Sequence, residues 1–144
     1  MSDNKYCYDY PRPAVSADCI IFDKSEGHLN ILLVERKNDP FKGMWALPGG
    51  FIEEDETVDY GAHRELKEET GLELEMEQFR AYSEPDRDPR GRIITIAFIA
   101  ITEKANQEPK AGDDAKNVKW FSISELPLLA FDHQKIIEDA LKSL

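Results

Sequence analysis

The chain has 144 residues, of which 41% are hydrophobic and 33% charged, and its formal net charge at pH 7 is −11. This length favours one domain with a single core, and the longest apolar run, residues 93–101, is too short to span a membrane. The negative charge argues against a nucleic-acid polymer as partner, because affinity for a phosphate backbone needs clustered Lys and Arg.

Residues 1–13 are polar and interrupted by proline, so we expect an arm, followed by one domain over residues 14–144. The arm lacks the apolar stretch of a signal peptide. The two cysteines, Cys7 and Cys19, are too few for a disulfide framework. A reduced, cytoplasmic protein is the simplest interpretation of both features.

Five segments have the alternation or the β-branched content of strands. Residues 14–22 and 29–35 flank a group of turn-forming residues and predict a hairpin. Residues 93–102 form the strongest strand prediction, and further strands are expected at residues 73–84 and 118–121.

A helix is expected after Thr57, which is well placed as its N-terminal cap. It should end at Gly71, because glycine favours the left-handed conformation that follows a helix end. Val58, Ala62 and Leu66 recur at a spacing of four and should face the core.

Two shorter helical segments follow near the C-terminus. A brief helix is expected over residues 122–126, and a terminal amphipathic helix over residues 132–144, with Asp132 as its cap. Strands combined with helices and long loops indicate an α/β or α+β fold.

Carboxylates are concentrated in the first helix and the loop before it. Glu65, Glu68 and Glu69 lie at i, i+3 and i+4, which places them on one side of a helix. Like charges at that spacing destabilise a helix, so a cation among them is favoured. Carboxylate oxygens suit Mg²⁺, which often takes a substrate phosphate as a further ligand. A solvated helix face is the alternative for this fragment alone.

The frame around these acids is more specific than the helix. Gly50 is followed at fixed spacings by Glu56, by Arg64-Glu65-Leu66, by Glu68-Glu69 and by Gly71-Leu72. This pattern resembles the Nudix box of the Nudix hydrolases, and most of the chain is similar to members of that family. The resemblance implies a three-layer αβα sandwich around a mixed, curved β-sheet.

The resemblance also implies a metal site that uses Mg²⁺, with Mn²⁺ as a substitute. Its ligands would be Glu65, Glu68 and Glu69, supported by Glu56, with a carbonyl near Gly49 or Gly50 completing the metal shell. We expect Pro48-Gly49-Gly50 to form a tight turn in which glycine permits a positive φ.

The implied catalytic residues are Glu68 and Arg64, with Arg64 orienting the glutamates, although an ordinary surface ion pair is the alternative for Arg64. The base that takes a proton from water would be Asp114, with Asp113 next. Two acids that solvate a turn are the alternative for that pair. His63 and His133 are assigned no role in metal binding or proton transfer.

Two groups of side chains bear on the substrate. Arg87, Arg90 and Arg92 form a basic island suited to phosphate oxygens, with a solvated loop as the alternative. A base could stack on aromatic side chains, which are otherwise ordinary core or rim residues. These aromatic residues are Phe41, Trp45, Tyr82 and Phe131.

The segments YSEPDRDPRGR and GDDAKNVKWFSISELP resemble the ADP-ribose pyrophosphatase-like branch of the family. The leading hypothesis is therefore a Mg²⁺-dependent hydrolase that converts ADP-ribose into AMP and ribose 5-phosphate. A MutT-like (d)NTP pyrophosphohydrolase and a non-catalytic nucleotide sensor are the alternatives. The resemblance is compatible with a homodimer, and no membrane partner is expected.

Overall fold

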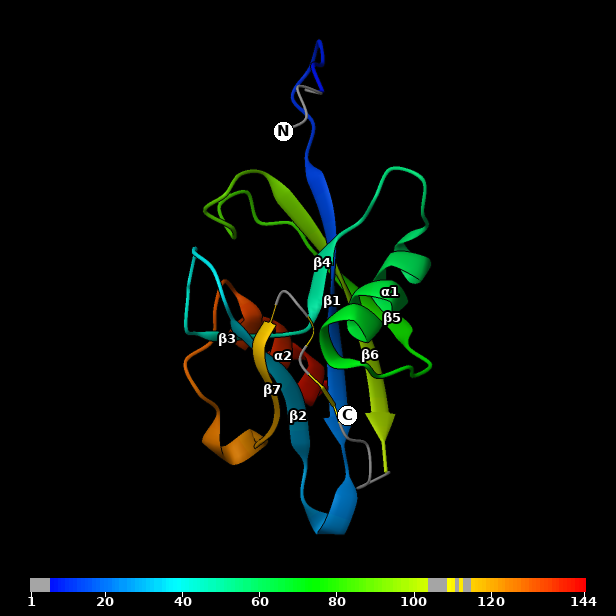
Figure 1. The fold of residues 1–144 in the computed structure, drawn as a ribbon, viewed down its shortest axis with the longest axis vertical. Coiled ribbons are helices and arrows are strands. Elements are labelled where there is room, and N and C mark those ends of the chain that lie inside the picture. The colour runs from blue at the N-terminus through cyan, green and yellow to red at the C-terminus, as the bar shows by residue number, and fades with distance from the viewer. Residues whose placement is uncertain (1–5, 104–108, 111, 113–114) are drawn as a thin grey trace.

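We describe residues 6–103, 109–110, 112 and 115–144 of a computed structural model of the chain. Figure 1 shows a mixed sheet with a helix on either side. The strands are β1 (Ala14–Asp23), β2 (Asn30–Arg36), β3 (Trp45–Ala46), β4 (Gly49–Phe51), β5 (Glu77–Tyr82), β6 (Ile93–Thr102) and β7 (Ala115–Ser122). The helices are α1 (Val58–Thr70) and α2 (His133–Lys142), with single 3₁₀ turns at η1 (Ser25–Gly27) and η2 (Ile123–Glu125).

The sheet forks beside its central strand, β1. The strand order is β3-β2-β1-β6-β5, with β7 paired to β2 and β4 paired to β1. β1 runs parallel to β6 along its whole length. It meets β2 at Phe22 and Asp23, whereas β4 lies against residues 16–18 of β1. The backbone therefore opens between β4 and β2.

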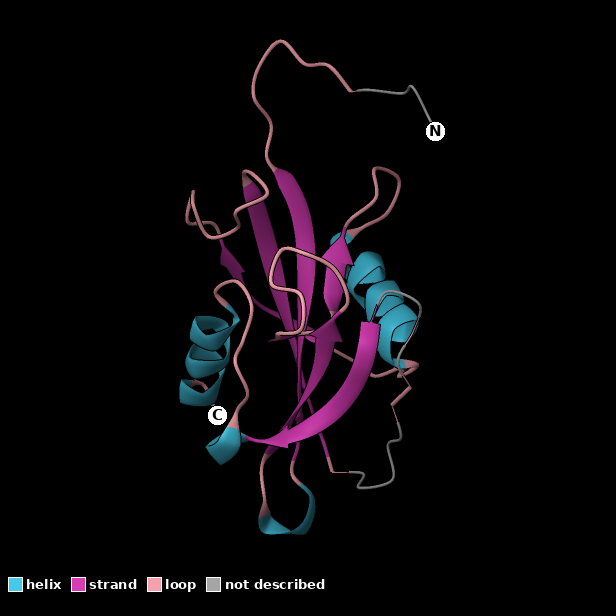
Figure 2. Ribbon diagram, turned by 60° about the vertical axis from the view of Figure 1, so that its left-hand side comes forward, coloured by secondary structure: helices cyan, strands magenta, loops and turns pink. Residues whose placement is uncertain are grey.

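Alternate residues of β1 feed two apolar layers, because successive side chains of a strand point to opposite faces. Ile20 and Phe22 belong to a cluster with the apolar residues of α2. Cys19 and Ile21 belong to a second cluster with those of α1. Figure 2 shows the two helices on opposite faces of the sheet, which confirms the predicted three-layer sandwich.

The predictions for the first helix are confirmed. The Thr57 hydroxyl accepts a hydrogen bond from the Tyr60 N–H at 3.1 Å, and Gly71 has a φ of 76° at the C-terminal end. Ala62 and Leu66 are fully buried, and Val58 packs against the same cluster. Local capping signals and apolar spacing therefore determine where α1 begins and which face it buries.

The bounds of two strands were predicted less well. The strand expected over residues 73–84 is shorter, since β5 begins only where it pairs with β6. The strand expected over residues 118–121 is longer, because β7 pairs with the whole of β2. The brief helix near residue 122 is the 3₁₀ turn η2.

The cap expected at Asp132 is also absent. Asp132 stands at the N-terminal end of α2, but its side chain makes no capping hydrogen bond. Its carboxylate is held by Arg87 instead. In the part of the chain that we describe, no helix has the length and apolar character needed to cross a bilayer.

Candidate functional site

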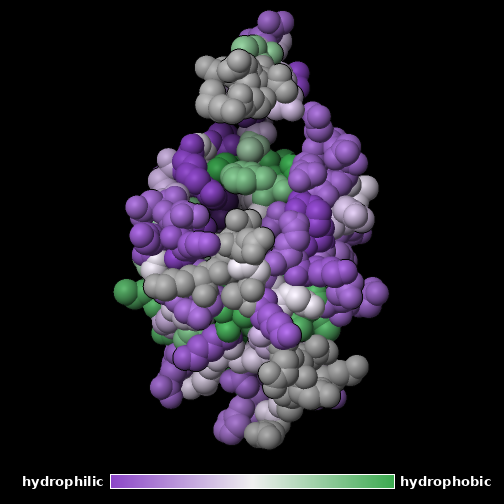
Figure 3. All heavy atoms as spheres, in the orientation of Figure 1, coloured by the Kyte–Doolittle hydropathy of each residue, from purple (hydrophilic) through white to green (hydrophobic). Residues whose placement is uncertain are grey.

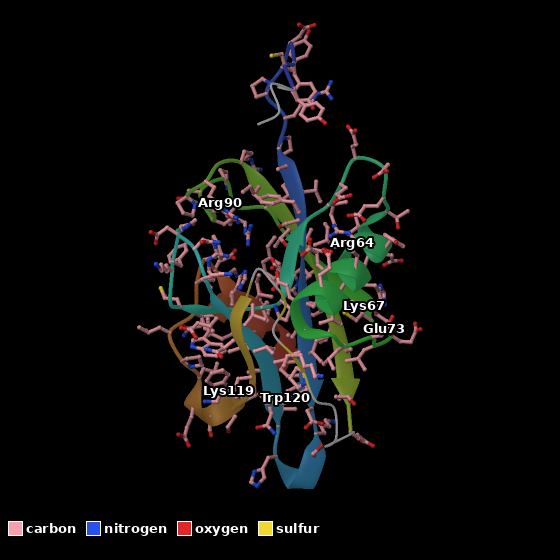
Figure 4. All side chains as sticks on the ribbon, in the orientation of Figure 1. Arg64, Lys67, Glu73, Arg90, Lys119 and Trp120 are labelled. Carbon is pink, nitrogen blue, oxygen red and sulfur yellow. The ribbon has the colours of Figure 1, made fainter. Side chains whose placement is uncertain are left out.

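A single guanidinium gathers three carboxylates from α1 and the loop before it. Arg64 donates from Nε and Nη2 to Glu56, at 2.9 and 2.6 Å, and from Nη1 to Glu65 at 2.9 Å. The same Nη1 lies 3.1 Å from both oxygens of Glu68, so the predicted pairing of Arg64 with Glu68 is present. Arg64 also donates to the backbone carbonyl of Phe51 and so joins α1 to β4 (Figure 4).

These contacts keep Glu56 ionised. Hydrogen bonds from Arg64 lower the pKa of Glu56 to about 2, aided by the backbone N–H of Glu53. The same hydrogen bonds, led by the one to Glu56, raise the pKa of Arg64. The Glu56 side chain is only 6% exposed, whereas that of Glu68 is 54% exposed. Glu68 is therefore the member of the cluster most accessible to a ligand.

Glycine is required in β4 for close packing. A Cβ on Gly50 would lie 2.4–2.6 Å from the carboxylate atoms of Glu65. A Cβ on Gly49 would lie 2.1 Å from the carbonyl oxygen of Ala17. The prediction of a tight turn with positive φ here is wrong, because both residues are in β4 and pair with β1. Missing side chains, not unusual backbone angles, bring β4 against β1 and Glu65.

Gly61 has a similar role inside α1. A Cβ on Gly61 would lie 2.5 Å from Ile52 Cδ1 and 2.8 Å from Glu56 Oε1. The loop before the helix can therefore fold down onto it, which brings the carboxylate of Glu56 within reach of Arg64.

A pocket of about 200 Å³ lies at the fork between β4 and β2. Figure 3 shows a hollowed surface in this upper part of the molecule, where an apolar patch lies between hydrophilic side chains. The predicted site residues that line the pocket are Gly50, Glu69, Arg87, Arg90 and Phe131. Further polar or charged side chains in the lining are Ser16, Asp18, Glu35, Arg36, Lys37, Asn38, Asp88 and His133.

Four predicted substrate-binding residues do not line the pocket: Phe41, Trp45, Tyr82 and Arg92. Phe41 packs edge-to-face against Phe131, with ring centroids 4.8 Å apart. Trp45 packs edge-on against Phe121, with ring centroids 4.7 Å apart. Tyr82 is buried and donates a hydrogen bond to Asp139 at 2.9 Å; burial, followed by this contact, raises the pKa of Tyr82 to about 12. Arg92 is exposed. None of the four belongs to the described lining of the pocket.

The floor of the pocket holds two residues that the sequence analysis did not assign. His133 Nδ1 accepts a hydrogen bond from the Leu47 N–H at 3.0 Å, so the ring proton of neutral His133 is on Nε2. Nε2 lies 3.6 Å from Asp18 Oδ1, and Thr95 donates to Asp18 Oδ2 at 2.6 Å. Burial opposes ionisation of Asp18, but His133 and Thr95 outweigh it and lower the pKa of the carboxyl.

The arginines of the loop before β6 are also paired. Arg87 is only 3% exposed and donates from Nε and Nη2 to the two oxygens of Asp132, at 2.9 and 2.7 Å. Arg90 makes an equivalent two-point contact with Asp88, at 3.0 and 2.7 Å. Burial opposes ionisation of Asp88, but the Arg90 contacts lower its pKa. Both arginines are thus held in fixed positions at the pocket.

The family can now be assigned from comparison with known proteins. The sequence profile of the NUDIX domain matches residues 12–140. The chain belongs to the Nudix family. An ADP-ribose pyrophosphatase of Methanocaldococcus jannaschii is 52% identical over 134 residues, which cover 92% of this chain and 76% of that protein.

Two solved Nudix structures are also similar. The NUDIX domain of Shewanella oneidensis NrtR, complexed with ADP ribose, superimposes with a TM-score of 0.89 at 30% identity and covers 99% of both chains. A bifunctional NMN adenylyltransferase/ADP ribose pyrophosphatase of Francisella tularensis, complexed with AMP and a Mn ion, has a TM-score of 0.83 at 32% identity. That match covers 94% of this chain and 43% of the Francisella chain.

Nudix hydrolases generally use divalent metals, and the donor types of the box suit such an ion. As they stand, no three Asp, Glu, His or Cys side chains of the described residues are arranged to hold a metal. However, Glu56, Glu65 and Glu68 already converge on one cation, the guanidinium of Arg64. Their hard oxygen donors fit Mg²⁺ or Mn²⁺.

The predicted bases, Asp113 and Asp114, lie outside the described residues. Their neighbour Gly112 donates its N–H to the Glu69 carbonyl at 3.0 Å, so this point of the loop lies against the last turn of α1. The nomination of Asp114 and Asp113 stays a prediction.

The sequence contains a signal for Asp18 but not for His133. Asp18 is a carboxylate within an otherwise apolar strand segment, and such a residue needs a specific partner. His133 gave no comparable signal, because its partners, Leu47 and Asp18, are distant in the sequence.

Proposed function

We propose that this Nudix domain hydrolyses the diphosphate bridge of ADP-ribose to give AMP and ribose 5-phosphate, with Mg²⁺ as the metal and Mn²⁺ as its substitute. The observation that carries this proposal is the convergence of Glu56, Glu65 and Glu68 on one cation. This cluster adjoins a charged pocket through Gly50 and Glu69.

The box residues would hold the metal through Glu65, Glu68, Glu69 and a carbonyl at Gly50, with Glu56 in support. When bound there, the ion would neutralise phosphate charge and lower the pKa of a water molecule. Arg64 orients the carboxylates from the side of α1, because its hydrogen bonds to Glu56 and Glu65 fix where their oxygens point. We keep Asp114, then Asp113, as the residues that accept the proton of the attacking water.

Basic side chains in the pocket lessen the obstacle that the net charge of −11 presents to an anionic nucleotide. Arg36, Lys37, Arg87 and Arg90 line it together. These side chains offset the field of the surrounding carboxylates, so a small diphosphate ester can approach. The net charge of −11 still argues against a nucleic-acid polymer as partner.

A substrate panel tests the proposal. ADP-ribose, other nucleoside diphosphate derivatives and (d)NTPs are each incubated with Mg²⁺, with Mn²⁺ and with EDTA, and AMP and pyrophosphate are measured separately. We expect AMP from ADP-ribose only when metal is present. Release of pyrophosphate from (d)NTPs, with ADP-ribose left intact, would favour the MutT-like alternative.

The similarity to an NrtR domain complexed with ADP ribose favours a second candidate, a nucleotide sensor. A sensor would bind ADP-ribose without converting it. Isothermal titration calorimetry beside the turnover assay separates the two, because binding with metal but no AMP release would identify a sensor.

A further inference from the structure

Two aromatic rings flank the guanidinium of Arg90 at the edge of the pocket. The Arg90 Cζ atom lies 5.0 Å from the ring centroid of Phe51 and 4.9 Å from that of Phe131. Both distances are within the range of cation–π contacts. All three side chains line the pocket, and Figure 4 shows that Arg90 comes from the loop before β6. We call Phe51, Arg90 and Phe131 the aromatic platform.

Asp88 restricts what Arg90 can do for a substrate. The Nε and Nη2 donors of Arg90 are both occupied by the Asp88 carboxylate, which is buried. The guanidinium therefore does not present this two-donor edge to a phosphate. Its planar group lies instead over the rings of Phe51 and Phe131 and supports them through cation–π contacts.

Backbone strain adds an independent observation. Phe131 has a φ of 53° and Phe41 a φ of 63°, a region in which bulky residues are rare. Their rings pack edge-to-face with centroids 4.8 Å apart, and Arg36 lies over the Phe131 ring at 4.9 Å. Strain of this kind persists where the surroundings hold a side chain in a required position. Here the position held is that of the Phe131 ring.

The platform and the acidic cluster lie on opposite faces of β4. Alternate residues of a strand point to opposite faces. Gly50 faces the Glu65 carboxylate, whereas the side chain of the next residue, Phe51, contacts Arg90 on the other face. A ligand with a diphosphate near Gly50 and a planar group near Phe51 would therefore reach both faces from the pocket. The Phe51 side chain remains 42% exposed, which leaves it accessible to such a group.

We propose that the aromatic platform binds the planar nucleobase of the substrate. The base stacks on the ring of Phe51, and Arg90 supports that ring. This inference rests on the proposed function and assigns the AMP half of the substrate to the platform. The ribose 5-phosphate half would then lie away from it. Base stacking on an aromatic ring tolerates different bases, so the platform explains nucleotide binding rather than choice between adenine and guanine.

Calorimetric titration of the two reaction products tests the assignment without any turnover. AMP and ribose 5-phosphate are titrated separately, with Mg²⁺ present, into the wild-type protein and into Phe51→Leu and Arg90→Lys. Phe51→Leu removes an exposed ring, and Arg90→Lys keeps the charge but removes the planar group. Tyr10→Leu is the matched control, because Tyr10 is an aromatic residue that is 79% exposed in the N-terminal arm.

We expect both variants to weaken AMP binding by about tenfold and to leave ribose 5-phosphate binding unchanged. The control should match the wild type for both products. Unchanged AMP binding in both variants, equal loss for both products, or no AMP binding by the wild type would each overturn the assignment. ADP-ribose turnover is measured separately, so a protein that binds AMP through the platform but hydrolyses no ADP-ribose would refute only the proposed function.

Discussion

His133 joins α2 to the segment that leads into β4, through a 3.0 Å hydrogen bond from the Leu47 N–H to His133 Nδ1. Both residues are buried, and the other ring nitrogen faces Asp18 in β1. The C-terminal helix is therefore part of what fixes Gly49 and Gly50. The helix α2, which is far from the Nudix box in sequence, thus helps to position the N-terminal end of the box.

His133→Leu should lower both stability and turnover, because the buried Leu47 N–H loses its acceptor. We expect the free energy of unfolding to fall by about 1–3 kcal/mol in urea denaturation. His133→Asn is the control, because its side-chain oxygen can occupy the position of Nδ1 and should restore most of the kcat. Equal kcat in wild type and His133→Leu would show that the bond does not position β4.

Arg87 and Arg92 occupy the same loop but should respond differently to the same change. Arg87→Met leaves the Asp132 carboxylate without its bidentate partner, so we expect a loss of about 2–3 kcal/mol in unfolding free energy. Arg92→Met should change it by less than about 0.5 kcal/mol, because this side chain is exposed. Similar losses in the two variants would indicate that Arg87 is not held by Asp132.

Glu56 should make stability depend on acid pH. Its pKa is about 2 in the folded protein, against 4.5 for the ordinary carboxyl. The stabilisation from ionised Glu56 is therefore present above pH 4.5 and is lost as the pH falls from 4.5 towards 2. We expect the Tm difference between wild type and Glu56→Gln to be largest at pH 7 and to narrow below pH 4.5. A difference that stays constant down to pH 3 would contradict this role of Glu56.

Tyr82→Phe tests whether this residue serves the core or the substrate. The hydroxyl donates to Asp139 of α2, so its removal should cost about 1 kcal/mol of unfolding free energy. The KM for ADP-ribose should not change, because Tyr82 is outside the pocket lining. A raised KM with unchanged stability would instead place Tyr82 in contact with substrate, as the sequence analysis had suggested.

Local signals explain why some elements were predictable. Thr57 and Gly71 mark the ends of α1 through capping and backbone preferences that act within a few residues. The strands β3 and β4 have only two and three residues, and partner strands stabilise them. Elements of that length carry no periodic pattern, so the sequence could not place them.

The residues of the candidate site also divide into those that a local pattern predicts and those that depend on tertiary packing. Glu65, Glu68 and Glu69 were predictable as a group because they share one helix, and Glu69 and Gly50 line the pocket. The contacts of Asp18 with His133 and of Arg87 with Asp132 depend on tertiary packing between distant segments. Asp132 shows the consequence, since a residue with the local pattern of a helix cap is recruited by a buried arginine instead.

The most direct test of the central claim is Mg²⁺-dependent turnover of ADP-ribose by Glu68→Gln and Glu69→Gln, beside Glu73→Gln. Glu73 is an exposed acid that pairs with Lys67 at 3.3 Å just beyond α1, so it controls for loss of one negative charge (Figure 4). We expect kcat to fall by at least about a hundredfold in the first two variants, since metal-bound charge stabilisation contributes several kcal/mol. Glu73→Gln should keep the wild-type rate. Wild-type rates in folded Glu68→Gln and Glu69→Gln would contradict the assignment of these carboxylates to a catalytic metal site.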